Sequence, residues 1–182
     1  MQEICMHGLG ARIEYSSLVS TLGNPDTRQT RIVWFHLTSF LSHAAMISKY
    51  LSPISKNEVA AARKNVLREI LGIAADSEVL PRDTRDNVEH FDERIDNWVG
   101  SENQNILEIV LLDRAGYNFM RVDEKRVKRV LILDELVFVS EKRDATKFEL
   151  SLHPLRQEVS RIESEAEKWI TKHSPYHFAF PR

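Results

Sequence analysis

The chain has 182 residues, of which 42% are hydrophobic and 29% charged, so it is long enough to bury a core without a disulfide or a metal. Its 25 Lys and Arg residues against 27 Asp and Glu residues give a formal net charge of -2, which excludes binding to nucleic acid or anionic membrane through an overall positive field. The single cysteine, Cys5, excludes an intrachain disulfide framework and a cysteine zinc cage, and we expect a reducing compartment, the cytoplasm.

The N-terminal residues 1 to 23 precede the first strong helical pattern. They hold no basic region followed by a long apolar run, so they do not resemble a signal peptide, and we expect a short helix around Arg12 to Leu22. No apolar stretch of the chain approaches the roughly 20 residues needed to cross a bilayer, so no membrane partner is predicted.

A long helix is predicted from Asn24 to about Tyr50. Asn24 is suited to cap the helix and Pro25 to its first position, whereas Pro53 ends it. Apolar side chains recur there at spacings of three and four, at Trp34, Leu37, Leu41, Ala44, Ile47 and Leu51. Further apolar residues widen this stripe, which is typical of a helix that contacts two neighbours.

Two more helices are predicted before the middle of the chain. Ser55 and Glu58 form a capping-box pattern, which indicates the start of a helix that ends at Gly72 in a left-handed cap. The stretch from Arg82 to Gly100 has charged residues on most faces and one apolar seam. That seam consists of Val88, Phe91, Ile95, Trp98 and Val99.

After Gly100 the pattern becomes extended. Ile106 to Leu112 is a β-rich apolar run, with a helical continuation as the alternative. Phe119 to Val122 predicts another strand, and Val130 to Val139 predicts two strands that flank a turn at Asp134-Glu135. Together these segments predict a small antiparallel β element.

The last predicted helix begins near Pro154 and has an almost regular apolar repeat, at Leu155, Val159, Ile162, Ala166 and Trp169. Four amphipathic helices, three of them joined by short links, predict a mainly α fold. We expect a four-helix up-down bundle with a small antiparallel β insertion between the third and fourth helices. Residues 1–182 are predicted to form a single helical domain, with a β-rich insertion at 104–150.

Several common chemistries are excluded by inspection, because the sequence contains no GxxxxGK, GxSxG, HExxH or CxxC motif. No histidine has a glutamate three positions earlier, so a di-iron centre is not predicted, nor is any other metal or cofactor. His36 and His43 share a helix face, where they either line a groove or are packed and hydrogen-bonded within the fold. The second interpretation is favoured, because histidine is often partly buried.

One local pattern indicates chemistry. Arg85 and Asp86 are followed by His90 and then by Phe-Asp-Glu-Arg. This string resembles the signature of the HEPN superfamily, in which four to six residues separate an Arg from a His in a four-helix bundle. The resemblance implies that Arg85 binds and polarises a phosphate, and that His90 acts as acid or base in RNA cleavage through the ribose 2′-hydroxyl. It further implies that Asp86 orients both residues, and that two copies of the motif meet in a homodimer.

The chemistry of this pattern is sound, since a guanidinium offers paired donors to phosphate and histidine titrates near neutral pH. On an ideal helix, however, residues five apart diverge by about 140°, so Arg85 and His90 converge only through a distorted first turn or a second subunit. The surrounding stretch is acidic, and RNA contacts are therefore predicted in the insertion, at Arg121, Lys125, Arg126, Lys128 and Arg129. The alternative for these residues is a solvated edge strand protected by charge.

Two functional hypotheses follow. The first is a HEPN-like, metal-independent endoribonuclease, or a related domain that binds RNA or a nucleotide, acting as a homodimer. The second is a non-catalytic interaction module whose bundle surface or β insertion docks a partner protein. In the second, Asp86, His90 and Arg94 form a row of ion pairs on the helix surface, four residues apart.

Overall fold

The structure of the chain is a computed structural model. It describes residues 1–24, 29–55, 57–81, 93, 95–96, 99, 106–119, 127–142, 144 and 146–173, with the backbone alone at 106 and 107. The elements within these residues are, in chain order, α1 (Gln2–Gly23), α2 (Thr30–Leu51), α3 (Glu58–Ile70), β1 (Ile106–Leu111), α6 (Arg114–Phe119), β2 (Val127–Ile132), β3 (Val137–Glu141), β4 (Lys147–Ser151) and α7 (Leu152–His173).

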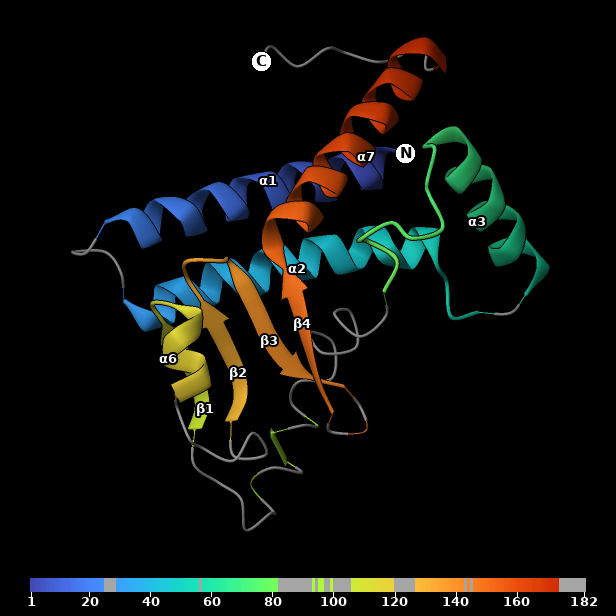
Figure 1. Ribbon diagram of the computed structural model, residues 1–182. Helices are drawn as coiled ribbons and strands as arrows, with labels where there is room; N and C mark the ends of the chain where they lie inside the picture. Colours follow the sequence, from blue (N-terminus) through green and yellow to red (C-terminus); the bar gives the residue numbers. More distant parts are fainter. Residues whose placement is uncertain are drawn as a thin grey trace.

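Three long helices, α1, α2 and α7, form the main core. Figure 1 shows α1 and α2 side by side with α7 crossing them, while the sheet lies against α2. α2 is central, since it contacts α1, α3 and α7 and its Trp34 ring meets Phe138 of β3 at a centroid distance of 6.3 Å. The largest fully buried side chains are Phe40, Phe138, Ile4, Leu18, Leu37, Leu41, Ile47, Leu51, Leu71, Leu131 and Ile132.

The sheet has four strands in the order β1-β2-β3-β4 and is mixed. β1 pairs with β2 in parallel, and the helix α6 lies in the connection between them, as a parallel pair requires. β2, β3 and β4 pair antiparallel, and the turn between β2 and β3 holds Asp134 and Glu135 as predicted. β4 runs directly into α7, where the Leu152 amide donates to the Leu136 carbonyl at 3.0 Å.

The predicted four-helix up-down bundle with a small antiparallel insertion is wrong. The described residues include the five helices named above and a four-stranded mixed sheet, and the sheet contributes Leu131, Phe138 and Leu150 to the same core as the long helices. The sheet is therefore a packed layer of the fold, and it lies against α2. Local hydrophobic periodicity did not indicate this, because the parallel pairing of β1 and β2 is a long-range contact.

The N-terminal helix is much longer than the short helix expected around Arg12 to Leu22, because α1 has 22 residues. Gly8 and Gly10 lie inside it, where their missing side chains allow close packing. A Cβ on Gly8 would lie 2.6 Å from the Glu163 Cβ of α7, and one on Gly10 would lie 2.5 Å from the His43 ring of α2. These glycines thus let α7 and α2 approach α1, and they do not interrupt the helix.

Other boundaries follow local chemistry. α3 is capped by Asn57, whose side chain accepts from the Ala60 amide at 2.7 Å, so the predicted cap at Ser55 is displaced by two residues. The predicted left-handed Gly72 is confirmed, with φ of +58°, and the amide of Ile73 donates to the Arg68 carbonyl in a Schellman arrangement. Phe119, predicted to begin a strand, ends the short helix α6.

Candidate functional site

The predicted catalytic residues, Arg85, Asp86 and His90, lie outside the residues that the structure describes. Four residues just after this motif, Glu93, Ile95, Asp96 and Val99, are described and are helical. The helix predicted from Arg82 to Gly100 is thus present at those four positions.

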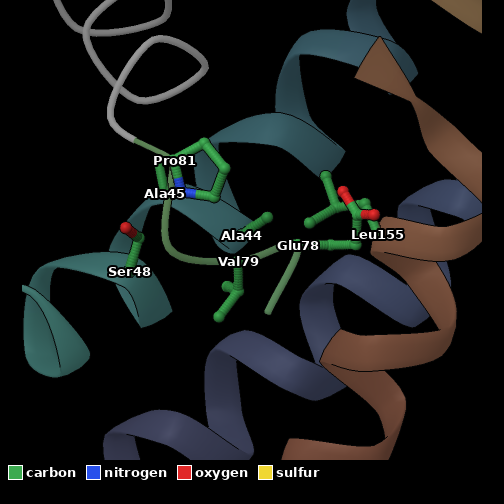
Figure 2. Close-up of a pocket in the computed structure, with 7 residues that line it drawn as sticks. All are labelled: Ala44, Ala45, Ser48, Glu78, Val79, Pro81 and Leu155. Carbon is green, nitrogen blue, oxygen red and sulfur yellow. The ribbon is translucent and has the colours of Figure 1, made fainter. Parts of the chain in front are cut away.

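The chain that leads to the motif is anchored between α2 and α7. Val79 is buried in the main core, and Pro81, four residues before Arg85, lines a small pocket. Figure 2 shows the pocket, which is lined by Ala44, Ala45, Ser48, Glu78, Val79, Pro81 and Leu155. Its volume of about 10 Å³ matches a single water, so the pocket is too small to admit a substrate.

A larger groove lies beside the same segment, with a volume of about 380 Å³. Its polar groups are already bonded to one another: the Ser77 hydroxyl donates to Glu158 Oε1 at 2.5 Å, and Arg161 donates to Glu158 Oε2 and to the Leu71 carbonyl, each at 2.8 Å. The bonds from Arg161, with that from Ser77, hold the pKa of Glu158 below its usual range. This network ties residues 71–77 to α7.

Two of the five residues predicted to bind RNA, Lys128 and Arg129, lie in β2, and both are buried. Lys128 Nζ lies 2.6 Å from Glu141 Oε1, and Arg129 pairs with Glu108 and lies over the Trp34 ring, 5.1 Å from its centroid. Burial lowers the pKa of Arg129 to about 10. Because β2 is an inner strand, a solvated edge strand does not describe these two residues. Arg121, Lys125 and Arg126 lie outside the described residues.

The contact between α1 and α2 contains two polar side-chain pairs, and each pair includes a histidine of α2. His36 Nδ1 lies 2.7 Å from Glu14 Oε2, and His43 Nδ1 lies 3.0 Å from His7 Nδ1. This confirms that His36 and His43 share a face and are packed and hydrogen-bonded within the fold. Burial, with the neighbouring His43, lowers the pKa of His7. Gly10 packs against the His43 ring. We call this row of contacts between His7, Glu14, His36 and His43 the histidine seam.

A buried carboxyl group also lies between α1 and α7. Glu163 packs its side chain on Gly8 and lies 3.6 Å from Arg12, and burial raises the pKa of its carboxyl group. Cys5 is nearby in the same helix pair, and burial raises the pKa of its thiol to about 11, so it lacks the thiolate character of a nucleophile. Across the described residues, no group of three or more His, Cys, Asp or Glu side chains is placed to hold a metal ion.

Sequence reasoning missed the partners in these contacts, namely His7, Glu14 and Glu163. The available signal was the pair Gly8 and Gly10 inside an otherwise helical stretch, since glycine within a helix often marks a close approach. Gly8 meets Glu163, and Gly10 meets His43. None of the helices that the structure describes has the length and apolarity to cross a membrane.

No family model, curated protein or solved structure matches this chain.

Proposed function

We propose that the chain is a HEPN-like, metal-independent endoribonuclease, or a related domain that binds RNA or a nucleotide. The observation that carries the proposal is the spacing of Arg85 and His90, with Asp86 beside the arginine and Phe-Asp-Glu-Arg after the histidine. The resemblance now rests on this motif alone, because the fold is not the predicted bundle. Described residues border the motif on both sides: Val79 before it is buried in the main core, and Glu93, Ile95, Asp96 and Val99 after it are helical.

In the proposed mechanism, the Arg85 guanidinium binds the scissile phosphate through paired N–H donors and offsets the charge that develops there. His90 removes the proton from the ribose 2′-hydroxyl or donates one to the leaving oxygen, and Asp86 orients the two residues. A homodimer would bring two such motifs together. Arg121, Lys125 and Arg126 are the residues that we still propose as contacts to the RNA. The compartment that we propose is the cytoplasm.

The experiment is cleavage of a labelled mixed-sequence RNA by the purified protein in EDTA. We expect the wild-type chain to cut the RNA, and His90→Ala and Arg85→Ala each to reduce the rate at least 100-fold, the usual contribution of an acid-base group. The matched control is His173→Ala, which removes an exposed histidine at the end of α7. Circular dichroism checks that each variant is folded. Absence of cleavage by the wild type, or cutting by His90→Ala at the wild-type rate, would overturn the endoribonuclease proposal and leave only the binding domain.

A second candidate is an interaction module that docks a partner protein through the β region. Leu112 lies just before α6 and Phe119 is its last residue, and both side chains are strongly exposed. Exposed apolar side chains that gather on one surface mark sites of protein interaction. This candidate predicts that Arg85→Ala and His90→Ala leave binding of the partner unchanged, whereas Phe119→Ser weakens it. Binding measured by calorimetry on a purified partner separates the two functions.

A further inference from the structure

Two histidines at one end of the histidine seam bring ring nitrogens together from different helices. The Nδ1 atoms of His7 in α1 and His43 in α2 lie 3.0 Å apart, and the ring centroids lie 5.3 Å apart with the ring planes tilted by 51°. The helices lie side by side here (Figure 1), and the contact of Glu14 with His36, seven residues away in each helix, shows that they run antiparallel. The register of α1 on α2 therefore fixes which histidines meet.

The spacing of the two nitrogens is that of two imidazoles on one metal ion. An imidazole nitrogen binds a divalent transition-metal ion at about 2.0 to 2.1 Å. Two such nitrogens lie about 2.9 Å apart when the angle at the metal is about 90°, as in tetragonal Cu²⁺ and Ni²⁺ sites, and about 3.3 Å apart in tetrahedral Zn²⁺ sites. The 3.0 Å between His7 and His43 falls between these values, so the pair matches two neighbouring positions of a metal's coordination shell.

Packing holds the His43 ring in place. A Cβ on Gly10 would lie 2.5 Å from this ring, so the ring rests directly on the backbone of α1. His7 and His43 are nevertheless each partly exposed, which leaves the pair within reach of an ion from solvent. A ligand that is already held in position loses less conformational freedom when it binds.

The charges around the pair also suit a cation. Burial and the neighbouring His43 lower the pKa of His7, so its ring is neutral at pH 7, and neutral imidazole is the form that binds metal ions. Residues 4–11 of α1 and 32–48 of α2 contain no Lys or Arg that would repel the ion. Glu3, whose charge acts on His7, lies four positions before it in the same helix.

We propose that His7 and His43 bind one divalent transition-metal ion, such as Ni²⁺, Cu²⁺ or Zn²⁺, through their Nδ1 atoms. Imidazole ligands suit these ions, whereas Mg²⁺ and Ca²⁺ prefer oxygen ligands. Water occupies the remaining coordination positions, because the described residues place no group of three His, Cys, Asp or Glu side chains around one ion.

Metal binding requires a change of tautomer in one ring. Without metal, the hydrogen bond between the two rings needs a proton on one of the two Nδ1 atoms. When the ion binds, this proton moves to Nε2 of the same ring, so that both Nδ1 lone pairs face the metal and no net proton is released. The ion then joins the first half of α1 to α2. Because the unfolded chain does not hold the two rings together, the ion stabilises the folded chain.

Isothermal titration calorimetry of the untagged chain with NiCl₂ and with ZnCl₂ at pH 7.5 tests the proposal. We expect one ion per chain for the wild type. His7→Gln and His43→Gln should each weaken binding at least tenfold, because loss of a residue that merely orients a ligand already weakens metal binding about 10- to 100-fold. The matched control is His36→Gln, which removes the other α2 histidine of the seam and should bind the ion as the wild type does.

Urea denaturation gives a second measurement, because NiCl₂ should raise the midpoint of the wild type and leave that of His7→Gln unchanged. Circular dichroism verifies folding, and His7→Gln alone decides if His43→Gln does not fold. Absence of binding by the wild type, or equal binding by the wild type and His7→Gln, would overturn the inference. So would an equal loss in His36→Gln, which would place the ion elsewhere.

This inference stands apart from the proposed ribonuclease activity. The RNA assay contains EDTA, which removes the ion, and it depends on Arg85 and His90, which take no part in this metal site. Absence of RNA cleavage by a chain that binds the metal would therefore count against the proposed endoribonuclease alone, and cleavage by a chain that binds no metal would count against the metal site alone.

Discussion

Apolar residues are usually buried and charged residues exposed, but helix α1 and strand β2 each contain exceptions, and the two kinds of exception are opposite. In α1, Met6 and Ile13 are apolar and lie on the surface, whereas in β2, Lys128 and Arg129 are charged and lie inside. The difference arises from how each element is surrounded. α1 contacts α2 and α7 but leaves one side uncovered, while β2 is flanked by β1 and β3 within the sheet.

Partners inside the fold make the buried charges of β2 tolerable. Glu141 of β3 faces Lys128 at 2.6 Å and has Lys147 of β4 at 3.7 Å, and Arg129 has Glu108 of β1. Desolvation of an ion is unfavourable by several kcal/mol, so each charge persists only while its partner stays in place. At these positions of α1 and β2, therefore, the neighbours of a residue determine its burial more than its type does.

The largest expected effect comes from removing one partner of a buried ion pair. Glu141→Gln leaves Lys128 buried without its carboxylate, and we expect the free energy of unfolding to fall by about 3 to 5 kcal/mol. Urea denaturation followed by circular dichroism measures this change. The double variant Lys128→Met with Glu141→Leu removes both charges and should recover most of the loss. A single variant as stable as the wild type would show that Lys128 is solvated.

A smaller effect is expected where α1 and α2 meet. Gly10→Ala places a Cβ 2.5 Å from the His43 ring, and we expect a loss of about 1 to 3 kcal/mol, as for other overpacked sites. Adding His43→Ala should remove most of the penalty, since the ring is the obstacle. Gly23→Ala at the end of α1 is the matched control, because no atom lies within 4 Å of its added Cβ. Equal effects at both glycines would contradict the packing role of Gly10.

The parts of the fold that were predictable from sequence are those with a one-sided apolar pattern. The helices α2 and α7 and the strands β2 and β3 were found because each shows its buried positions in its own local spacing. Only the second half of α1 was predicted, since the apolar residues of this helix lie on two sides and two glycines lie in its first half. β4, with the sequence KFELS, has no clear alternation of its own and merges into α7.

The candidate site was predictable to a smaller extent. The packed state of His36 and His43 followed from their spacing, but their partners Glu14 and His7 depend on the register between two helices, which no local pattern contains. Lys128 and Arg129 were interpreted as surface charges for a similar reason, since their acidic partners come from neighbouring strands. Long-range pairing thus set the limit in both regions.

The histidine seam should make stability depend on pH. The pKa of His7 is lowered by burial and by His43, so the unfolded chain binds a proton more readily than the folded chain. The stabilising contribution is therefore present above the unfolded pKa of about 6.5 and is lost as the pH falls below it. Glu3, Glu14, His36 and His43 carry ionisable side chains nearby, so the measurement compares the wild type with His7→Gln in urea at pH 7.5 and 5.5. The wild type should lose more stability than the variant, and an equal loss would assign the effect to the other groups.

The smallest expected effect concerns the exposed apolar residues of α1. Ile13→Ser should change the free energy of unfolding by less than about 0.5 kcal/mol in dilute solution, as for other surface changes, whereas Leu18→Ala on the buried side should lower it by about 2 to 5 kcal/mol. Ile13 is 52% exposed, whereas Leu18 is fully buried in the main core. Urea denaturation followed by circular dichroism measures both changes. Equal losses of stability at the two positions would contradict the assignment of Ile13 to the exposed side of α1 and of Leu18 to the core.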